Sequence, residues 1–358
     1  MPLGTLLRCS SVCQVFESEI GNRENEERAI CGQSVVLNGA SIRGKNNSRF
    51  DKGDEGPHDC AGEFRNGILT RAGGQRHYSS IEAPRRRPLA TVKIPADLET
   101  VLNDAWEEAR KVPGHLGENE ARFLGLLAAC VPAKGTIVEI GSFKGRSTVM
   151  LAKVASHYSL GPIVAIDPHN SPILLDHQAN QEATSYKDFL ASLQAAGVSD
   201  HVEPHVAYST DVASSWNRPI RLLWIDGDHT YEGARKDLDG FFPHLVPLGV
   251  VAFHDALNEF PGPIRVFVED VLRSDRFGPA GFVHSIAWAQ FRPQDGHAFR
   301  EPRSSLARRA SRLIPFVESG KELRGMAKRR FKLNRFRVPH STIDPADWAS
   351  LVDGPPLR

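Results

Sequence analysis

Glycines and carboxylates stand together where the first predicted strand meets a helix. This strand, residues 135–141, carries Glu139 near its end, and the segment Gly141-Ser142-Phe143-Lys144-Gly145 follows. The two glycines would let a ligand approach the backbone closely, and the carboxylate of Glu139 suits a cationic group. The next strand, residues 162–168, places Asp167 where it could accept hydrogen bonds from the vicinal hydroxyls of a ribose. These residues predict a site for an adenosine-type ligand with a positively charged end.

S-Adenosylmethionine has these features, since it carries a ribose, an adenine and a methionine part with an ammonium group. A dinucleotide fits less well, because the glycines are spaced G-x-x-x-G, whereas a pyrophosphate-binding turn has G-x-G-x-x-G. The predicted cofactor-binding residues are Glu139, Gly141, Ser142, Gly145, Ser147, Asp167 and Asp226.

Acidic and imidazole side chains follow the next two apolar segments. The run IRLLWID ends in Asp226, with His229 three residues later, and VVAFHD ends in His254 and Asp255. Methyl transfer from a sulfonium requires that the acceptor be aligned and its proton removed. We therefore predict that Asp226 and His229 are catalytic, with His229 as the general base. Asp226, His254 and Asp255 could hold a divalent cation, Mg²⁺ or Mn²⁺, that acidifies an acceptor hydroxyl.

A structural role is the alternative for each of these four side chains. Asp226 and Asp255 could cap strand ends, and the two histidines could be hydrogen-bonded core residues. Nearby, we expect Asp228 and Tyr231 to cap or pack the following helix, and Asp237 to pair with Lys or Arg on the helix surface.

The elements that would position these residues alternate along the chain. Two helices are predicted first, one with Leu98, Val101, Leu102 and Trp106 at helical spacing and one over 117–131. Continuous apolar strands then occur at 135–141, 162–168, 201–207, 220–227 and 249–255, separated by helices at 146–157, 184–196, from 210, 231–242 and 264–272. Such strands are buried on both faces, which predicts a parallel, doubly wound sheet. The last two strands, 281–286 and 287–292, leave no room for a crossover helix, so at least one must be antiparallel.

Charge divides the 358 residues into three regions, with net charges of +2 over 1–90, −9 over 91–290 and +8 over 291–358. Residues 1–90 show no lasting hydrophobic period and are predicted to be a disordered extension, either dispensable or a targeting or docking arm. Residues 91–295 are the predicted enzymatic domain. Residues 296–358 are predicted to be a basic, partly helical tail, with 12 Lys or Arg against 3 Glu from 301 to 340.

Composition excludes several classes of protein. With 41% hydrophobic and 24% charged residues, the chain is neither fibrous, collagen-like nor wholly disordered. No apolar stretch approaches the ~18 to 20 residues of a membrane span, and the first residues do not resemble a secretory signal. The five cysteines lack zinc-site spacing and are expected to be free thiols. We expect a cytoplasmic protein.

Four segments together resemble the class I S-adenosylmethionine-dependent methyltransferases: VEIGSFKGRSTVMLA, AIDP, LLWIDGDHTYEGARKDLDGFFPHLVPLGVVAFHDA and PGPIRVFVEDV. Within that class they are most similar to bacterial sugar and macrolide O-methyltransferases, the methyltransferase family 24-like group. The resemblance covers 115–292. It implies an α/β fold with a doubly wound, mostly parallel seven-stranded sheet and one antiparallel strand near the C-terminal end. It also implies O-methylation of a small molecule such as a sugar or glycosylated metabolite.

The resemblance also bears on the metal. Related metal-dependent sugar O-methyltransferases carry an Asp at the end of the fourth strand, a His three residues later and an acidic pair after the fifth strand. Asp226, His229 and Asp255 match this pattern. His254 stands where those relatives have an acid, and an imidazole ligand favours softer ions such as Mn²⁺ or Zn²⁺ over Mg²⁺.

Other functions remain open at this level. A nicotinamide-dependent oxidoreductase would use the same scaffold, although the dinucleotide glycines are missing, and a non-catalytic cofactor-binding module would keep only the pocket. The basic tail could be a solvated helix, or could bind an anionic membrane surface or a lipid-linked glycan. Nucleic acid is not expected as a partner, because aromatic residues for base stacking are sparse there. The resemblance also implies a homo-oligomer, because relatives often associate through such N-terminal helices.

Overall fold

The structure is a computed structural model that describes residues 91–170 and 185–354 of the chain. All of these belong to the second of two compact units, Ile81–Arg358. The predicted extension over 1–90, four of the five cysteines and residues 171–182 of the loop after the second strand lie outside the described residues.

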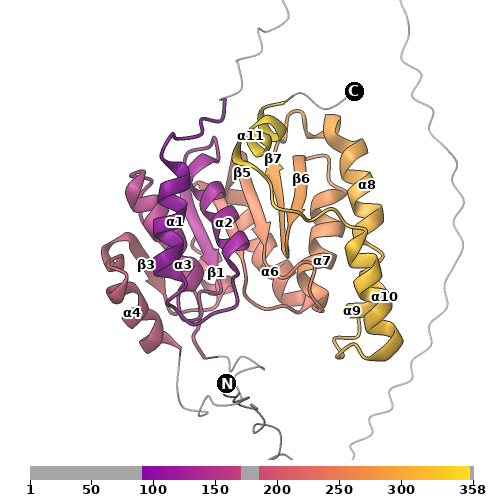
Figure 1. The fold of residues 1–358 in the computed structure, drawn as a ribbon, viewed down its shortest axis with the longest axis horizontal. Coiled ribbons are helices and arrows are strands. Elements are labelled where there is room, and N and C mark those ends of the chain that lie inside the picture. Colours follow the sequence, from indigo (N-terminus) through magenta and orange to yellow (C-terminus); the bar gives the residue numbers. More distant parts are fainter. Residues whose placement is uncertain (1–90, 171–184, 355–358) are drawn as a thin grey trace, which may run out of the picture. The chain divides into compact units, whose positions relative to one another are not determined.

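Seven strands form one sheet in the order β3-β2-β1-β4-β5-β7-β6 (Figure 1). Their bounds are β1 (Thr136–Ile140), β2 (Ile163–Ile166), β3 (Val202–His205), β4 (Ile220–Ile225), β5 (Leu245–Phe253), β6 (Phe277–Val283) and β7 (Ile286–Phe291). Strands β1 to β5 pair in parallel, and β7 is antiparallel to both β5 and β6. Only His284 and Ser285 separate β6 from β7, so the chain can return only as a hairpin. The predicted doubly wound sheet with one antiparallel strand is confirmed.

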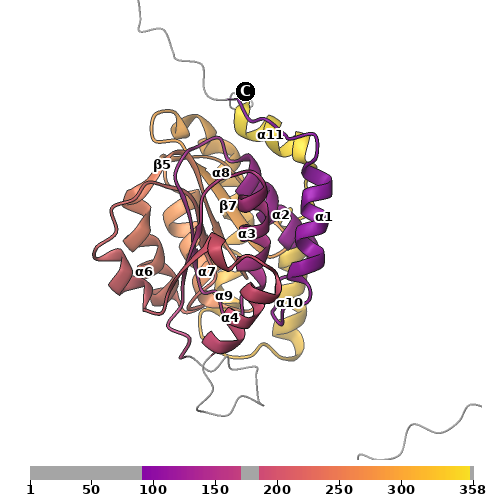
Figure 2. The same ribbon diagram turned by 90° about the vertical axis from the view of Figure 1, so that its left-hand side faces the viewer.

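Helices cover both faces of the sheet. One face packs against α1 (Leu98–Ala109), α2 (Glu118–Cys130), α3 (Arg146–His157), α4 (Tyr186–Ala195) and α11 (Pro345–Asp353). The other packs against α5 (Ser209–Ala213), α6 (Tyr231–Phe241), α7 (Pro261–Val266), the π-helical turn η3 (Phe267–Leu272), α8 (Arg300–Ala310), α9 (Ile314–Val317) and α10 (Gly325–Phe336). Short 3-10 turns occupy η1 (Ser199–His201), η2 (Phe242–His244) and η4 (Gly296–Phe299). Figure 2 shows the sheet between α6 on one side and α1 on the other.

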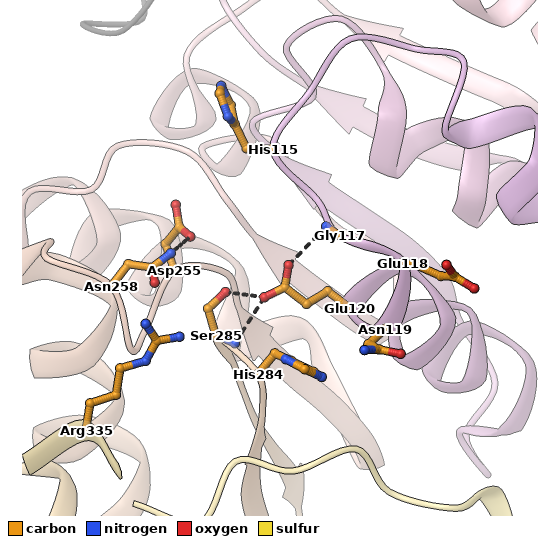
Figure 3. A pocket seen from close by; sticks show the side chains of 10 residues that line it. All are labelled: His115, Gly117, Glu118, Asn119, Glu120, Asp255, Asn258, His284, Ser285 and Arg335. Carbon is orange, nitrogen blue, oxygen red and sulfur yellow. Dashed lines mark hydrogen bonds between the residues drawn. The ribbon is translucent and has the colours of Figure 1, made fainter. Parts of the chain in front are cut away.

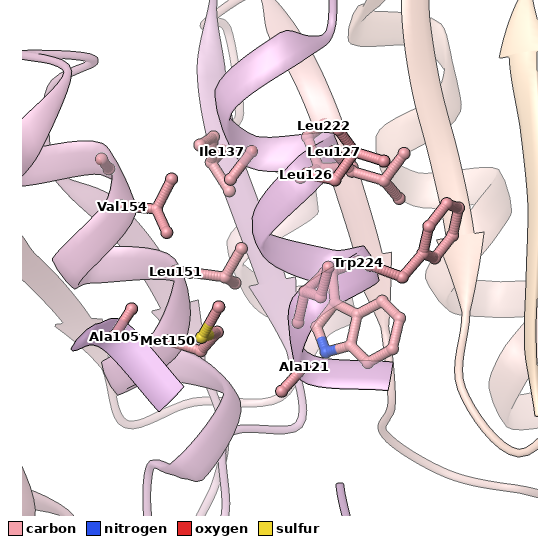
Figure 4. Packing of buried hydrophobic residues seen from close by; sticks show 14 of the residues in the cluster. Ala105, Ala121, Leu126, Leu127, Ile137, Met150, Leu151, Val154, Leu222 and Trp224 are labelled. Atoms are coloured by element: carbon pink, nitrogen blue, oxygen red, sulfur yellow. The ribbon is translucent and has the colours of Figure 1, made fainter. Parts of the chain in front are cut away.

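Alternating side chains of each strand fill two separate cores. Ile137 of β1 packs on the α3 face, in the same core as Trp224 of β4 and as Met150 and Leu151 of α3 (Figure 4). Val138, the next residue of β1, faces the α6 side. Burial on both faces is the reason that the strands read as continuous apolar runs. This packing fixes the carboxyl ends of β1 and β4 relative to each other.

The segment beyond residue 296 is helical over much of its length and contributes to both cores. Trp348 of α11 is buried against the α3 face, and Phe331 of α10 is buried against the α6 face. The boundaries predicted at 91, 295 and 358 stay a prediction. Within residues 91–170 and 185–354, no helix combines the length and the apolar character needed to cross a bilayer.

Candidate active site

The carboxyl ends of the parallel strands bring the predicted site residues to one edge of the sheet. Backbone hydrogen bonds continue the pairing one residue past the strands, at 2.8 to 3.1 Å. The amide donors and their carbonyl acceptors are Gly141 to Ile166, Asp167 to His205, Asp226 to Ile140, and His254 to Ile225. These bonds hold the first residue after each strand in register with its neighbour, so the site is built on rigid elements.

The loop after β1 turns tightly around two glycines. Gly141 has φ +87° and Gly145 has φ +96°, values that side-chain-bearing residues rarely adopt. A β-carbon on Gly141 would lie 2.7 Å from the backbone nitrogen of Gly227, so the loop contacts the backbone that follows β4. A β-carbon on Gly145 would lie 3.2 Å from the ring of Phe189. Glycine is therefore required at both positions of this loop, residues 141–145, which leads into α3 and is called the glycine cradle below.

Asp167 braces this cradle from the end of β2. One carboxylate oxygen accepts hydrogen bonds from the amides of Ser142 (2.9 Å) and Phe143 (2.8 Å), and the other accepts from the amide of His169 (2.7 Å). A carboxylate has about four lone-pair positions, so room remains for hydroxyl donors. The ribose contact of Asp167 stays a prediction, and the structure adds this bracing role.

Glu139 lies beneath the cradle with none of its surface exposed. One carboxylate oxygen accepts from the hydroxyl of Thr148, and the other has no hydrogen-bond partner among the described residues. Burial, reinforced by the charges of Asp226 and Asp167, raises the pKa of Glu139 to about 8, although Ser147 and Thr148 act in the opposite direction. An unpartnered buried oxygen of this kind suits an N–H donor such as a ligand ammonium.

Two serines complete the predicted cofactor set. Ser142 is buried in the loop, and its hydroxyl has no partner among the described residues. Ser147 is buried in the first turn of α3. The structure thus gathers all seven predicted cofactor residues around one loop and the adjoining end of β4. Their individual contacts with a cofactor stay predictions.

His229 faces two carboxylates beside the cradle. Its Nε2 atom lies 3.5 Å from Oδ1 of Asp226 and 3.6 Å from Oδ2 of Asp255. The ring stacks on Phe260, with centroids 4.5 Å apart. Burial would lower the pKa of His229, but the carboxylates of Asp226 and Asp255 outweigh it and raise that pKa.

His254 is buried on the far side of Asp226, with 2% of its surface exposed. Its Nδ1 lies 3.1 Å from Asp226, and its Nε2 lies 3.4 Å from Glu120. Carboxylates on both ring nitrogens require both nitrogens to donate, so the ring carries a positive charge. Burial alone would lower the pKa of His254, but these carboxylates hold it well above its usual value. For Asp226, burial alone would raise the pKa, but the charges and hydrogen bonds of His254 and His229 outweigh it and lower that pKa to about 2.

The structure therefore changes the predicted set of metal ligands. Asp226, His229 and Asp255 each offer one ligand atom within 4.8 Å of the others, whereas both nitrogens of His254 face Asp226 and Glu120. Two carboxylates and an imidazole are suitable donors for a divalent cation. A cation would thus be held by His229 in place of His254, and the use of a metal stays a prediction.

Glu120, at the start of α2, is a residue that the sequence interpretation missed. Its Oε1 accepts from the amide of Ser285 at 3.0 Å and from the Ser285 hydroxyl, and its Oε2 accepts from the amide of Gly117 at 3.1 Å (Figure 3). These contacts and the one with His254 lower the pKa of Glu120 to about 2 although burial opposes them. His254 and Ser285 are 134 and 165 residues away from Glu120 in the sequence, so no local pattern reveals these two contacts.

The loop after β4 differs from the prediction for Asp228, and α6 differs from it for Asp237. Thr230 caps α6 in place of Asp228, which accepts from the amide (2.8 Å) and hydroxyl (3.0 Å) of Thr230. Asp237 is buried, where we expected a surface ion pair, and accepts from the hydroxyl of Ser209. The α5–α6 contact covers this side of the helix, which explains the difference.

Comparison with known proteins agrees with this geometry. Residues 138–256 match a family model described as a methyltransferase domain. Cofactor-bound Rv0187 from MTB is 20% identical, with 56% of this chain and 92% of that one covered and a TM-score of 0.39. An O-methyltransferase from Bacillus cereus in complex with SAH is 18% identical, with coverage of 56% and 92% and a TM-score of 0.38. TomG from Streptomyces achromogenes, in complex with SAM, is 18% identical, with coverage of 56% and 92% and a TM-score of 0.39.

Those structural similarities are low, so the assignment rests on the family match to the segment that carries the cradle and the His229 cluster. Residues 138–256 include Glu139, the glycine loop and Asp255. Residues 138–256 of the chain thus match a methyltransferase domain.

Proposed function

We propose that the protein methylates a hydroxyl group of a small molecule, such as a sugar or a glycosylated metabolite. The observation that carries this proposal is the position of His229 between Asp226 and Asp255, directly beside the glycine cradle. A hydroxyl must lose its proton as it accepts a methyl group, and a histidine held by carboxylates is suited to take it.

The chain's own residues have two tasks in this reaction. S-Adenosylmethionine supplies, when bound, a methyl group that the sulfonium has already activated. His229 then takes the proton of the acceptor hydroxyl on Nδ1, because its Nε2 is turned toward the carboxylates. The positive charge that forms on the ring is stabilised by Asp226 and Asp255, and Phe260 fixes the ring plane by stacking.

A divalent cation bound by Asp226, His229 and Asp255 is the second candidate arrangement, and the 4.8 Å ligand cluster favours it. Such a cation would lower the pKa of the acceptor hydroxyl. The two arrangements exclude each other at His229, because Nε2 cannot carry a proton that faces the carboxylates and bind a cation at once. The charged ring of His254 already neutralises Asp226, and this favours the metal-free arrangement.

Methyl transfer from labelled S-adenosylmethionine to a panel of free sugars, nucleotide sugars and glycosides tests the proposal. We expect His229→Gln to lower the rate by roughly 10²-fold or more while the affinity for S-adenosylhomocysteine is kept. The exposed His297→Gln is the control. An unchanged rate in His229→Gln would contradict the assignment of the base. We expect chelation with EDTA to leave the rate intact, and a loss that Mn²⁺ restores would support the cation arrangement.

The other functions considered from the sequence are less well supported. The family match to a methyltransferase domain speaks against a nicotinamide-dependent oxidoreductase. The paired geometry of His229, Asp226 and Asp255 speaks against a module that has lost its catalysis. The expected cytoplasmic location, homo-oligomer and absence of a nucleic-acid partner remain proposals.

We also propose that α10 attaches the protein to an anionic membrane surface. Three large apolar side chains on this helix are exposed: Met326 (61%), Leu333 (55%) and Phe336 (81%). Their spacing of seven and then three residues places them on one face. Arg329, Arg330 and Lys332 are exposed on the same helix. Apolar side chains flanked by basic ones are typical of helices that lie on membrane surfaces.

A further inference from the structure

A cavity of about 240 Å³ opens next to the His229 cluster, between α2 and α10. Four separate parts of the chain form its walls, namely residues 115–120, the loop after β5, the β6–β7 hairpin and Arg335 of α10 (Figure 3). Asp255 belongs to this wall and also lies 3.6 Å from His229, so the cavity adjoins the predicted base. A group bound here could belong to the same molecule as the acceptor hydroxyl.

The acidic side chains around the cavity already have partners or point away from it. Both oxygens of Glu120 accept hydrogen bonds, from Ser285 and Gly117. Asp255 accepts from the side-chain amide of Asn258 on one oxygen and faces His229 with the other. The exposed carboxylate of Glu118 points away from the cavity centre in Figure 3. The acidic residues therefore leave no free carboxylate for a cation inside the cavity.

Arg335 lines this cavity without an ion pair among the described residues. Its guanidinium extends from α10 toward Asn258 and Asp255 in Figure 3, and its Nε is buried without a hydrogen-bond partner. No ion pair joins Arg335 to any residue within 91–170 and 185–354. Phe331, one helical turn earlier, is buried on the same inward face of α10.

A second donor or acceptor in the cavity is also without a partner. The Nε2 atom of His284, in the β6–β7 hairpin, is buried and unbonded within the described part of the chain. Buried polar atoms in folded proteins almost always have a partner, so Nε of Arg335 and Nε2 of His284 leave hydrogen-bonding capacity unused in the wall of this cavity. The guanidinium of Arg335 forms no ion pair within the described residues, and its planar donors match a carboxylate or phosphate in two-point hydrogen bonds, so it suits an anion.

We propose that this cavity binds a carboxylate or phosphate substituent of the acceptor, with Arg335 as its charge partner. The inference rests on the proposed methyl transfer, since it assigns the neighbouring subsite of the same acceptor. Arg335 is then a specificity-determining residue, because it selects acceptors with a negative charge at a fixed place relative to the hydroxyl near His229. It lies outside the segment that matches the methyltransferase model, so this preference is a property of the chain's own C-terminal helices.

Calorimetric titration of the full chain, saturated with S-adenosylhomocysteine, tests this inference. The probes are inorganic phosphate, glucose 1-phosphate, glucuronate and, as the neutral control, glucose. We expect the native chain to bind at least one anionic probe and not glucose, and Arg335→Gln to weaken that binding by about tenfold or more. Arg335→Lys should bind the anion more tightly than Arg335→Gln but less tightly than the native chain, since lysine keeps the positive charge but lacks the planar pair of N–H donors. Arg308→Gln, a change at an exposed position of α8, should have no effect.

The outcomes separate this inference from the proposed function. A native chain that binds S-adenosylhomocysteine but none of the anions, or anions that bind Arg335→Gln and the native chain equally, would overturn the role of Arg335 alone. Failure to bind S-adenosylhomocysteine would count against the proposed function itself. A phosphate-only or glucuronate-only response identifies which kind of anion the cavity takes. Equal melting temperatures of the three variants exclude misfolding as the cause.

Discussion

The backbone of Asp226 fills the space where a side chain on Gly141 would begin. A β-carbon at position 141 would overlap the Asp226 carbonyl and lie 2.7 Å from the nitrogen of Gly227. The loop predicted to bind the cofactor and the strand end that carries Asp226 are thus packed backbone to backbone. This contact holds the predicted donor site and the end of β4 next to the predicted base in one rigid unit.

Replacing Gly141 tests this contact. We expect Gly141→Ala to weaken S-adenosylhomocysteine binding by at least roughly tenfold, because both the positive φ and the clash push the loop away from β4. Gly161→Ala is the matched control, since Gly161 has nearly the same φ (+88°) but open space around its β-carbon position. Equal affinities of the two variants in calorimetry would show that the contact with Asp226 does not shape the site.

Glu120 is expected to stabilise the fold through His254. Glu120→Ala removes the carboxylate that pairs with the buried ring and with Ser285, and breaking such a pair costs about 3 kcal/mol or more. The free energy of unfolding in urea measures this loss. Glu118→Ala, an exposed change in the same helical turn, should cost far less. A similar small loss in both variants would contradict the pairing of Glu120 with His254.

Asp237 gives the fold a dependence on pH. Burial raises the pKa of this carboxyl to about 6 from 3.8. The folded protein keeps the proton where the unfolded chain has released it, so stability falls as pH rises from 4 to 6 and then levels off. Asp237→Asn removes the titrating group and so avoids this loss of stability. Between pH 4 and 6, the free energy of unfolding of the variant should rise relative to that of the native chain by up to about 3 kcal/mol.

Unfolding free energies measured from pH 4 to 8 check this prediction. Asp239→Asn, on the exposed side of the same helix, should show no comparable gain. A gain for Asp237→Asn that is the same at pH 4 and pH 7 would mean that the carboxyl titrates normally.

The exposed face of α10 makes the membrane proposal testable without removing the tail. Deletion would take away buried residues such as Trp348 and Phe331, whereas substitutions at exposed positions leave the core intact. We expect Leu333→Gln with Phe336→Gln to lower sedimentation with phosphatidylserine vesicles by at least roughly tenfold in affinity. Leu351→Gln, at an exposed position of α11, is the control. Binding unchanged by the double variant would refute the assignment of this face.

Much of the architecture follows from the apolar pattern of the sequence. Strands such as β4 are buried on both faces, so they read as continuous apolar runs between helices, and the parallel sheet follows. The predicted ends of helices and strands are less accurate where proline or glycine interrupts the apolar pattern. β5 begins at Leu245, four residues before the predicted start, because Pro247 and Gly249 lie within it.

The candidate site was predictable where residues follow strands, and not where packing joins distant segments. Asp226, His229 and Asp255 come together because β4 and β5 are neighbours, which the order of elements already indicated. Glu120 and Arg335 reach the site from α2 and α10, whose positions depend on the three-dimensional packing of both helices. The assignment of His254 changed for the same reason, since its second partner, Glu120, comes from α2.

The most direct test of the account is calorimetric titration of the full chain with S-adenosylmethionine, S-adenosylhomocysteine and NAD. We predict micromolar binding of the first two and no binding of NAD, with affinity lost in Asp167→Ala, which removes both the brace of the loop and the predicted ribose contact. Binding of NAD alone, or of none of the three, would contradict the account.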